Sequence, residues 1–83
     1  MHTGTQFTGT LAPNQSINYY TFGWPSAWDV TWMIVPTTAG TVAQIQWTVS
    51  TQLSGTAITY WILVKNLTNA TVDIQGRYAV LNA

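Results

Sequence analysis

Apolar and polar residues alternate along most of this 83-residue chain, and the alternation limits the fold more than any other feature. It is clearest in the segment Val42–Thr51, which reads VAQIQWTVST. Successive side chains of a β-strand point to opposite faces of the sheet. A period of two therefore predicts a strand with one buried face and one face in solvent.

Alternating segments recur along the chain at short, regular spacing, with turn residues between them. The expected strands are Thr5–Leu11, Ser16–Phe22, Trp28–Val35, Val42–Thr51, Ala57–Lys65 and Thr71–Leu81. Short strands at this spacing are typical of a sandwich or a small barrel with antiparallel neighbours. The sequence predicts an all-β protein: a small six-stranded antiparallel β-sandwich, jelly-roll or immunoglobulin-like, with one domain over residues 1–83 and no helix longer than one turn.

The phase of each alternation selects the side chains expected in the core. In the second segment we take Phe22 as inward-facing, which places Tyr19 on the opposite face. Trp24 follows beside Pro25 in an expected loop. The expected core is Phe7, Leu11, Phe22, Val30, Trp32, Ile34, Ile45, Trp47, Val49, Ile58, Tyr60, Ile62, Val64, Ile74, Tyr78 and Val80.

Charged residues are scarce, which excludes several classes of function. Only 5% of the residues are charged and the formal net charge is zero, whereas soluble domains average roughly 25%. Without a basic patch to neutralise phosphates, we expect no nucleic-acid partner. The apolar runs are far shorter than a membrane-spanning helix requires, so we expect no membrane span. Met1-His2-Thr3 does not begin a signal peptide, which indicates a mature or trimmed chain. The sequence does not determine the location of the protein and only slightly favours an extracellular or secreted one.

The residues that carry most catalytic and metal chemistry are nearly missing from the sequence. There is no cysteine, the single histidine is His2, and the carboxylates are Asp29 and Asp73. Nucleophilic catalysis needs a positioned base, and glycoside hydrolysis needs two facing carboxyl groups. We therefore expect no enzyme, no catalytic residue, no metal site and no cofactor.

The N-terminal quarter carries a family resemblance. The stretch Phe7–Ser16, FTGTLAPNQS, is followed by Tyr19–Phe22, YYTF. Together they resemble the GxLxxGxxxxYxF start of bacterial pre-peptidase C-terminal modules. The resemblance implies a small jelly-roll-like sandwich, non-catalytic and associated with binding or secretion, as appended to secreted enzymes. The Trp24–Trp28 loop and the Trp-rich third segment depart from that pattern, so no site residue carries over.

Abundant uncharged polar residues and several aromatic residues outside the expected core favour recognition of a neutral glycan. Aromatic rings stack on the apolar face of a sugar, while amide and hydroxyl groups hydrogen-bond its hydroxyls. The expected ligand-binding residues are Trp24, Trp61 and Tyr19 as stacking groups, with Asp29, Gln44 and Gln46 as hydrogen-bonding groups.

The alternative interpretation is a self-assembling structural protein with no small ligand, because subunit interfaces also favour Trp, Tyr and Met. Under either interpretation we expect a homo-oligomer, since so few charges oppose association. The expected interface is an outward strand face with Trp61 and Leu63, joined by Met33 and Val35. Three N-glycosylation sequons, beginning at Asn14, Asn66 and Asn69, are interpreted as chance matches in a chain rich in Asn and Thr.

Overall fold

The computed structural model describes residues 1–39 and 42–82, and these residues form six strands and no helix. The strands are β1 (His2–Leu11), β2 (Ser16–Pro25), β3 (Val30–Pro36), β4 (Ile45–Ser54), β5 (Ala57–Asn66) and β6 (Val72–Val80). All six expected strands are confirmed, with ends that differ from expectation by at most three residues. Within the described residues, no helix has the length and apolar character needed to cross a membrane.

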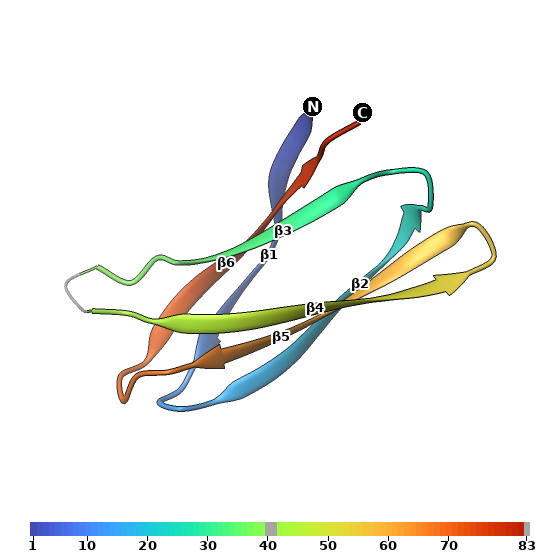
Figure 1. Ribbon diagram of the computed structural model, residues 1–83. Helices are drawn as coiled ribbons and strands as arrows, with labels where there is room; N and C mark the ends of the chain where they lie inside the picture. The colour runs from blue at the N-terminus through green and yellow to red at the C-terminus, as the bar shows by residue number, and fades with distance from the viewer. Residues whose placement is uncertain (40–41, 83) are drawn as a thin grey trace.

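The strands form two three-stranded sheets, ordered β1-β6-β3 and β2-β5-β4, in which all neighbours are antiparallel. We call them sheet A and sheet B. The chain changes sheet at every connection except the β4–β5 hairpin. Figure 1 shows the two sheets one above the other, in a sandwich-like arrangement, with both chain termini at the same end of sheet A.

The core lies between the sheets and draws on both. Its buried side chains are Leu11, Trp24, Trp32, Ile34, Tyr60, Ile62, Val64, Val72, Ile74 and Val80. Most of the expected core residues are buried here or packed partly buried against this cluster. Two are not, since Phe22 is 73% exposed and Val49 is 41% exposed. Two residues that were not expected there, Trp24 and Val72, belong to the core.

Strand β2 faces the core with the set of residues opposite to the expected one. Tyr19 packs against the core, whereas Phe22 points away from it. Aromatic residues occupy both faces of this strand, so hydrophobicity alone does not determine its phase. The pairing with β5 shifts register between Thr21 and Trp24, and Gly23 there has a φ of 82°. This bulge inserts one residue and turns Trp24 back into the core.

Val49 is exposed because sheet A covers β4 only in part. Val49 and Leu53 lie on the inner face of β4, opposite Ile62 and Ile58 of β5. Strand β3 has seven residues and β4 has ten. Leu53 remains 64% exposed. The expectation that Val49 is a core residue is therefore wrong.

Candidate functional site

Three aromatic rings lie side by side on the outer face of sheet B. Tyr20 of β2 pairs directly with Trp61 of β5, and their ring centroids are 5.2 Å apart. Phe22 follows two residues after Tyr20, with its ring centroid 6.4 Å from that of Tyr20. Tyr20 is 61% exposed and Phe22 73% exposed. We call these three residues the aromatic surface.

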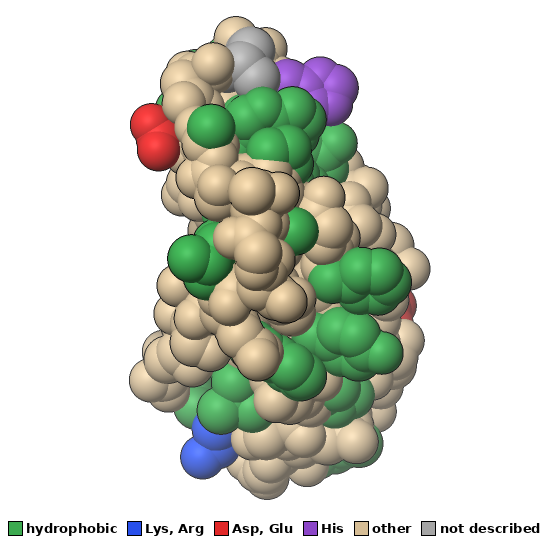
Figure 2. Space-filling view, turned by 90° about the vertical axis from the view of Figure 1, so that its right-hand side faces the viewer, with side chains coloured by type: hydrophobic (Ala, Val, Ile, Leu, Met, Phe, Trp, Pro, Cys, Tyr) green, Lys and Arg blue, Asp and Glu red, His purple; other side chains and the backbone are tan. Residues whose placement is uncertain are grey.

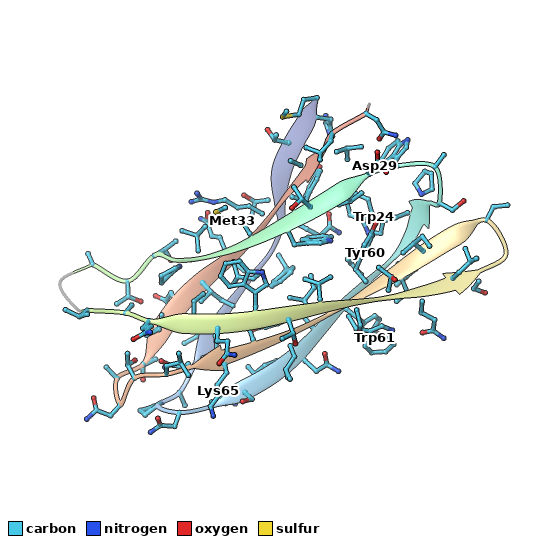
Figure 3. The ribbon with its side chains drawn as sticks, viewed as in Figure 1. Trp24, Asp29, Met33, Tyr60, Trp61 and Lys65 are labelled. Carbon is cyan, nitrogen blue, oxygen red and sulfur yellow. The ribbon has the colours of Figure 1, made fainter. Side chains whose placement is uncertain are left out.

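A hydrogen bond holds the indole of Trp61. Its Nε1–H donates to Oε1 of Gln52 on the neighbouring strand β4, at 3.0 Å. The ring is tilted by 32° from that of Tyr20 and is half-buried. Figure 3 shows Trp61 on the side of sheet B that points away from sheet A. Because its N–H is already paired, the indole presents mainly apolar ring surface to an incoming molecule.

The rest of the outer face of sheet B is almost entirely uncharged. The register places hydroxyl and amide side chains around the rings: Ser16, Asn18, Thr48, Ser50, Gln52, Ser54 and Thr59. Leu63, which is 46% exposed, lies between the aromatic surface and Lys65. The outer face of sheet B therefore suits a neutral ligand better than an ionic one. Figure 2, which views the end of the molecule at the right of Figure 1, likewise shows hydrophobic side chains among uncharged polar ones, with few charged groups.

A shallow depression lies at the other end of the same sheet. Its lining includes Gln44, Gln46 and Trp47, and its volume is about 410 Å³. A smaller one of about 140 Å³ lies beside it, between Gln46, Trp47 and Lys65. Gln44 and Gln46 therefore come together as expected. Gln46 pairs with Lys65, which lies four residues from Trp61 along β5, so these two positions of β5 are roughly 13 Å apart. The smaller depression comes nearer to the indole, because its lining includes Leu63, two residues from Trp61.

Trp24 is in the core rather than in an exposed loop. Its side chain is 8% exposed and packs edge-on against Trp32, Tyr60 and Tyr78. Its Nε1–H donates to Oγ1 of Thr21 at 3.1 Å. Because so little of its side chain is exposed, Trp24 has no open ring face on which a sugar could stack.

Tyr19 also lies on the inner side of its strand. Its ring stacks on that of Phe7, with centroids 4.6 Å apart. Burial raises the pKa of the Tyr19 hydroxyl. The side chain is half-buried and is not part of the aromatic surface. The expectation that Tyr19 faces outward with Trp61 is wrong.

Asp29 belongs to the loop between β2 and β3. Its backbone N–H donates to Oδ1 of Asn82, and its carbonyl oxygen accepts the N–H of Leu81, both at 2.8 Å. Figure 3 shows Asp29 beside sheet A, at a distance from Trp61. Its carboxylate contributes to raising the pKa of Tyr60, after the larger effect of burial. Asp29 therefore does not join the aromatic surface.

The four expected interface residues are divided between opposite sides of the molecule. Trp61 and Leu63 lie on the outer face of sheet B. Met33 and Val35 lie on the outer face of sheet A, where Met33 is 58% exposed. A single contact patch containing all four is ruled out by this geometry, although each pair remains accessible.

Sequence reasoning missed Tyr20 and Phe22. The residue that indicates the correct phase of β2 is Ile17, which precedes Tyr20 and Phe22 in the strand and packs against the core. If the alternation is started from Ile17, then Tyr19 and Thr21 point inward and Tyr20 points outward. Taking Phe22 as the inward-facing residue instead reverses the strand.

The aromatic surface offers contact and hydrogen bonding rather than acid–base chemistry. Asp29 and Asp73 both lie away from it, on the side of sheet A. The carboxylate of Asp73 accepts a hydrogen bond from Thr10 Oγ1 at 2.8 Å. Among residues 1–39 and 42–82, no three His, Cys, Asp or Glu side chains come together.

Comparison with family models, with curated proteins and with solved structures found no match to this chain. The resemblance of the N-terminal quarter to bacterial pre-peptidase C-terminal modules therefore stays a prediction.

Proposed function

We propose that this protein is a non-catalytic binding module that recognises a neutral glycan through the aromatic surface. The observation that carries the proposal is that the exposed rings of Tyr20 and Phe22 lie side by side with the half-buried indole of Trp61 on one sheet face. Exposed contiguous apolar groups in a soluble protein mark an interaction site more often than isolated ones do. A jelly-roll or immunoglobulin-like type of sandwich is part of the same proposal, since both types present flat sheet faces.

The chemistry around the rings favours a sugar as the ligand. A pyranose has apolar C–H faces, which stack on aromatic rings, and a rim of hydroxyl groups. Ser50 and Gln52 border Trp61 on β4, and Asn18 borders the rings on β2. Their hydroxyl and amide groups match sugar hydroxyls as donors and acceptors. Since Lys65 is the charged residue of this face and lies at its far end, a neutral glycan fits better than an acidic one.

The binding residues that we now propose differ from the set expected from the sequence. Trp61 stays as a stacking group, and Tyr20 and Phe22 replace Trp24 and Tyr19. Gln44 and Gln46 line the depression near Trp47 and would contact a longer oligosaccharide that extends from the rings. Asp29 has no place in this arrangement.

A glycan array followed by calorimetric titration of the best neutral oligosaccharide tests the proposal, because the heat of binding can be measured for every variant. We expect Trp61→Ala to weaken binding by about tenfold or more, because central aromatic contacts dominate most interfaces. Met33→Ala is the matched control, since Met33 is exposed on the outer face of sheet A. The proposal fails if no neutral glycan binds at millimolar concentration, or if both variants lose affinity equally.

The second candidate function is self-assembly without a small ligand. The observation that favours it is apolar exposure on both outer faces, at Leu63 and at Met33. Contacts that used both faces would join copies into an open stack rather than a closed pair. Light scattering over a concentration series separates the two functions. The mass of an open stack increases with protein concentration, whereas glycan binding requires no such increase.

A further inference from the structure

Both sheets are open, so each has two strands with one unpaired edge. These are β1 and β3 in sheet A, and β2 and β4 in sheet B. An edge strand presents free backbone N–H and C=O groups that can pair with another chain. Natural sheets usually block such edges with bulges, prolines, charges or short strands.

Three of the four edge strands carry a feature of this kind. Strand β1 has a register shift between Thr5 and Phe7. Strand β2 has one between Thr21 and Trp24 and ends at Pro25. Strand β3 has seven residues and ends at Pro36. None of these three edges offers a long, regular backbone to a partner.

Strand β4 lacks all of these features. It has ten residues, Ile45–Ser54, and contains no proline, glycine or charged residue. Its pairing with β5 runs without a register shift along the whole strand. Figure 1 shows β4 at one edge of its sheet, with β5 as its neighbour on the other side. A regular, uncharged edge of this length is open to pairing.

The inner face of β4 also carries apolar side chains that this chain does not cover. Val49 is 41% exposed and Leu53 is 64% exposed, although both point toward the side of sheet A. Pairing at the free edge would place another strand beside these residues and remove part of their surface from water. The apolar exposure and the open edge therefore coincide on one strand.

The sequence of β4 is chemically symmetric about Val49. In an antiparallel pair centred there, each residue meets its counterpart at an equal distance on the other side of Val49. The resulting pairs are Ile45 with Leu53, Gln46 with Gln52, Trp47 with Thr51, Thr48 with Ser50, and Val49 with itself. Apolar groups meet apolar groups, and amides and hydroxyls meet their like. Only the Trp47 pair is mixed.

From this self-complementarity we propose that two copies of the chain form a two-fold symmetric dimer by antiparallel pairing of β4 with β4, centred on Val49. The contact is isologous, since the same strand serves both subunits. It needs no ligand and does not rest on glycan binding. It differs from the interface expected from the sequence, which used outward faces of the strands.

The dimer would join the two copies of sheet B into one continuous six-stranded sheet. A two-fold axis perpendicular to a sheet keeps outward side chains outward. Both aromatic surfaces would then lie on the same face, with the two β5 strands roughly 14 Å apart. Such a dimer presents two equivalent surfaces to one extended partner.

Mass measurement by light scattering or native mass spectrometry is the first test. The chain has a mass of 9.2 kDa, and we expect twice that value at about 100 µM, because one strand pair is a small interface. A strict monomer at that concentration overturns the proposal, and so does a larger oligomer that survives loss of the β4 contact.

Single cysteines locate the contact, because the natural chain has none. With Val49→Cys, the two thiols meet on the symmetry axis, where opposed residues have the Cα spacing of a disulfide. Leu63→Cys is the matched control, because Leu63 is similarly exposed at 46% against 41% for Val49. We expect rapid oxidation to a covalent dimer for Val49→Cys only. Faster crosslinking of Leu63→Cys would show that outer faces meet instead and would overturn the proposal.

A pair of double variants tests the register. Thr48→Lys with Ser50→Lys places lysines opposite lysines, and we expect the Kd of the dimer to rise about tenfold or more. Thr48→Lys with Ser50→Glu places each lysine opposite a glutamate and should keep the natural Kd or lower it. Thr48 and Ser50 are both exposed, so both variants should fold, as circular dichroism would verify. Equal Kd values for the two variants would overturn the register.

A control variant adds the same positive charge on a strand that lies outside the proposed contact. Thr3→Lys with Thr5→Lys adds the same two charges on β1, where both threonines are exposed. We expect this variant to dimerise as the natural chain does. If it dissociates as far as the β4 lysine variant, the effect is a general repulsion and the strand contact is not supported.

Discussion

The ring of Phe7 stacks on the ring of Tyr19, with centroids 4.6 Å apart and planes inclined by 20°. Phe7 lies on β1 of sheet A and Tyr19 on β2 of sheet B, so the pair joins the sheets along one side of the core. Since Tyr19 points inward to reach Phe7, its neighbour Tyr20 must point outward. The aromatic surface on sheet B is therefore a direct consequence of this stacking.

Gly76→Ala should destabilise the fold, because Phe7 covers this glycine. A Cβ atom built at Gly76 collides with the phenyl ring of Phe7. Overpacking of this kind costs about 1–3 kcal/mol. Urea unfolding measures the loss, and Phe7→Leu in the same chain should restore part of it by removing the ring. If Gly76→Ala unfolds like the natural protein, the ring does not lie where the structure places it.

Trp24→Phe and Trp32→Phe should differ although both indoles are buried. The indole N–H of Trp24 donates to Thr21, whereas Trp32 Nε1 is buried without a hydrogen-bond partner among the described residues. Loss of the Trp24 bond should add about 1 kcal/mol to the cost of the smaller ring. Removal of the unpaired Trp32 N–H should offset part of that cost. Equal free energies of unfolding for the two variants would contradict the assignment.

The phase of β2 is tested by Tyr19→Ser and Phe22→Ser. Phe22 is 73% exposed, so its loss should change the free energy of unfolding by less than about 0.5 kcal/mol. Tyr19 packs on Phe7 and the core, and its loss should cost about 2 kcal/mol or more. The reverse order would support the phase that was expected from the sequence.

The strands could be predicted from the sequence because alternation is a local signal. The inward-facing residues of β5, from Ile58 to Val64, are predicted correctly. One face of this strand is apolar from Ile58 to Val64, whereas the other holds Thr59 and Lys65. The burial of Trp24 could not be predicted in the same way. It depends on a bulge at Gly23 and on space between two sheets, neither of which the alternation of one strand reports.

The candidate site was predicted less well than the fold, for the same physical reason. Trp61 was placed correctly, because its neighbours Tyr60 and Ile62 set the phase of β5 without ambiguity. Tyr20 and Phe22 were missed because both faces of β2 carry aromatic rings. The exposure of Val49 could not be predicted because it depends on how far β3 of sheet A extends over β4 of sheet B. The alternation within β4 does not report this.

Asn66→Ala should be among the most destabilising substitutions of a polar residue. Asn66 is fully buried, and its Nδ2 donates to the carbonyl oxygens of Ala12 and Ala70 at 3.2 and 2.7 Å. Its Oδ1 accepts the N–H and the hydroxyl of Thr68. Removal leaves buried partners unpaired, at about 1–3 kcal/mol for each. Thermal unfolding measures the loss, and Thr68→Val, which removes one of these bonds, should cost less.

Asn66→Asp gives a second measurement of the same site, with a pH dependence. A carboxylate there would face carbonyl oxygens, which disfavours its charged form, so its folded pKa should lie above the unfolded value. The variant should then be most stable below about pH 4 and lose stability as the pH rises through the folded pKa. A variant whose stability rises over that range would contradict this arrangement of hydrogen bonds.

The protein should lose stability at alkaline pH through the buried Tyr60 and the half-buried Tyr19. Burial raises the pKa of Tyr60 above its ordinary value of 10.0, and the carboxylate of Asp29 adds to the effect. Burial raises the pKa of Tyr19 in the same direction. The folded state then holds these protons more tightly than the unfolded state does. The stabilisation from these two groups is complete below the ordinary tyrosine pKa and is lost as the pH rises through the raised pKa values.

Urea unfolding between about pH 9 and pH 12 measures this loss, with tyrosinate absorbance recorded in parallel. Phe keeps both rings and removes both hydroxyl protons, so Tyr19→Phe with Tyr60→Phe should flatten the alkaline part of the curve. If the double variant loses stability as steeply as the natural protein, deprotonation of these two residues does not cause the alkaline unfolding.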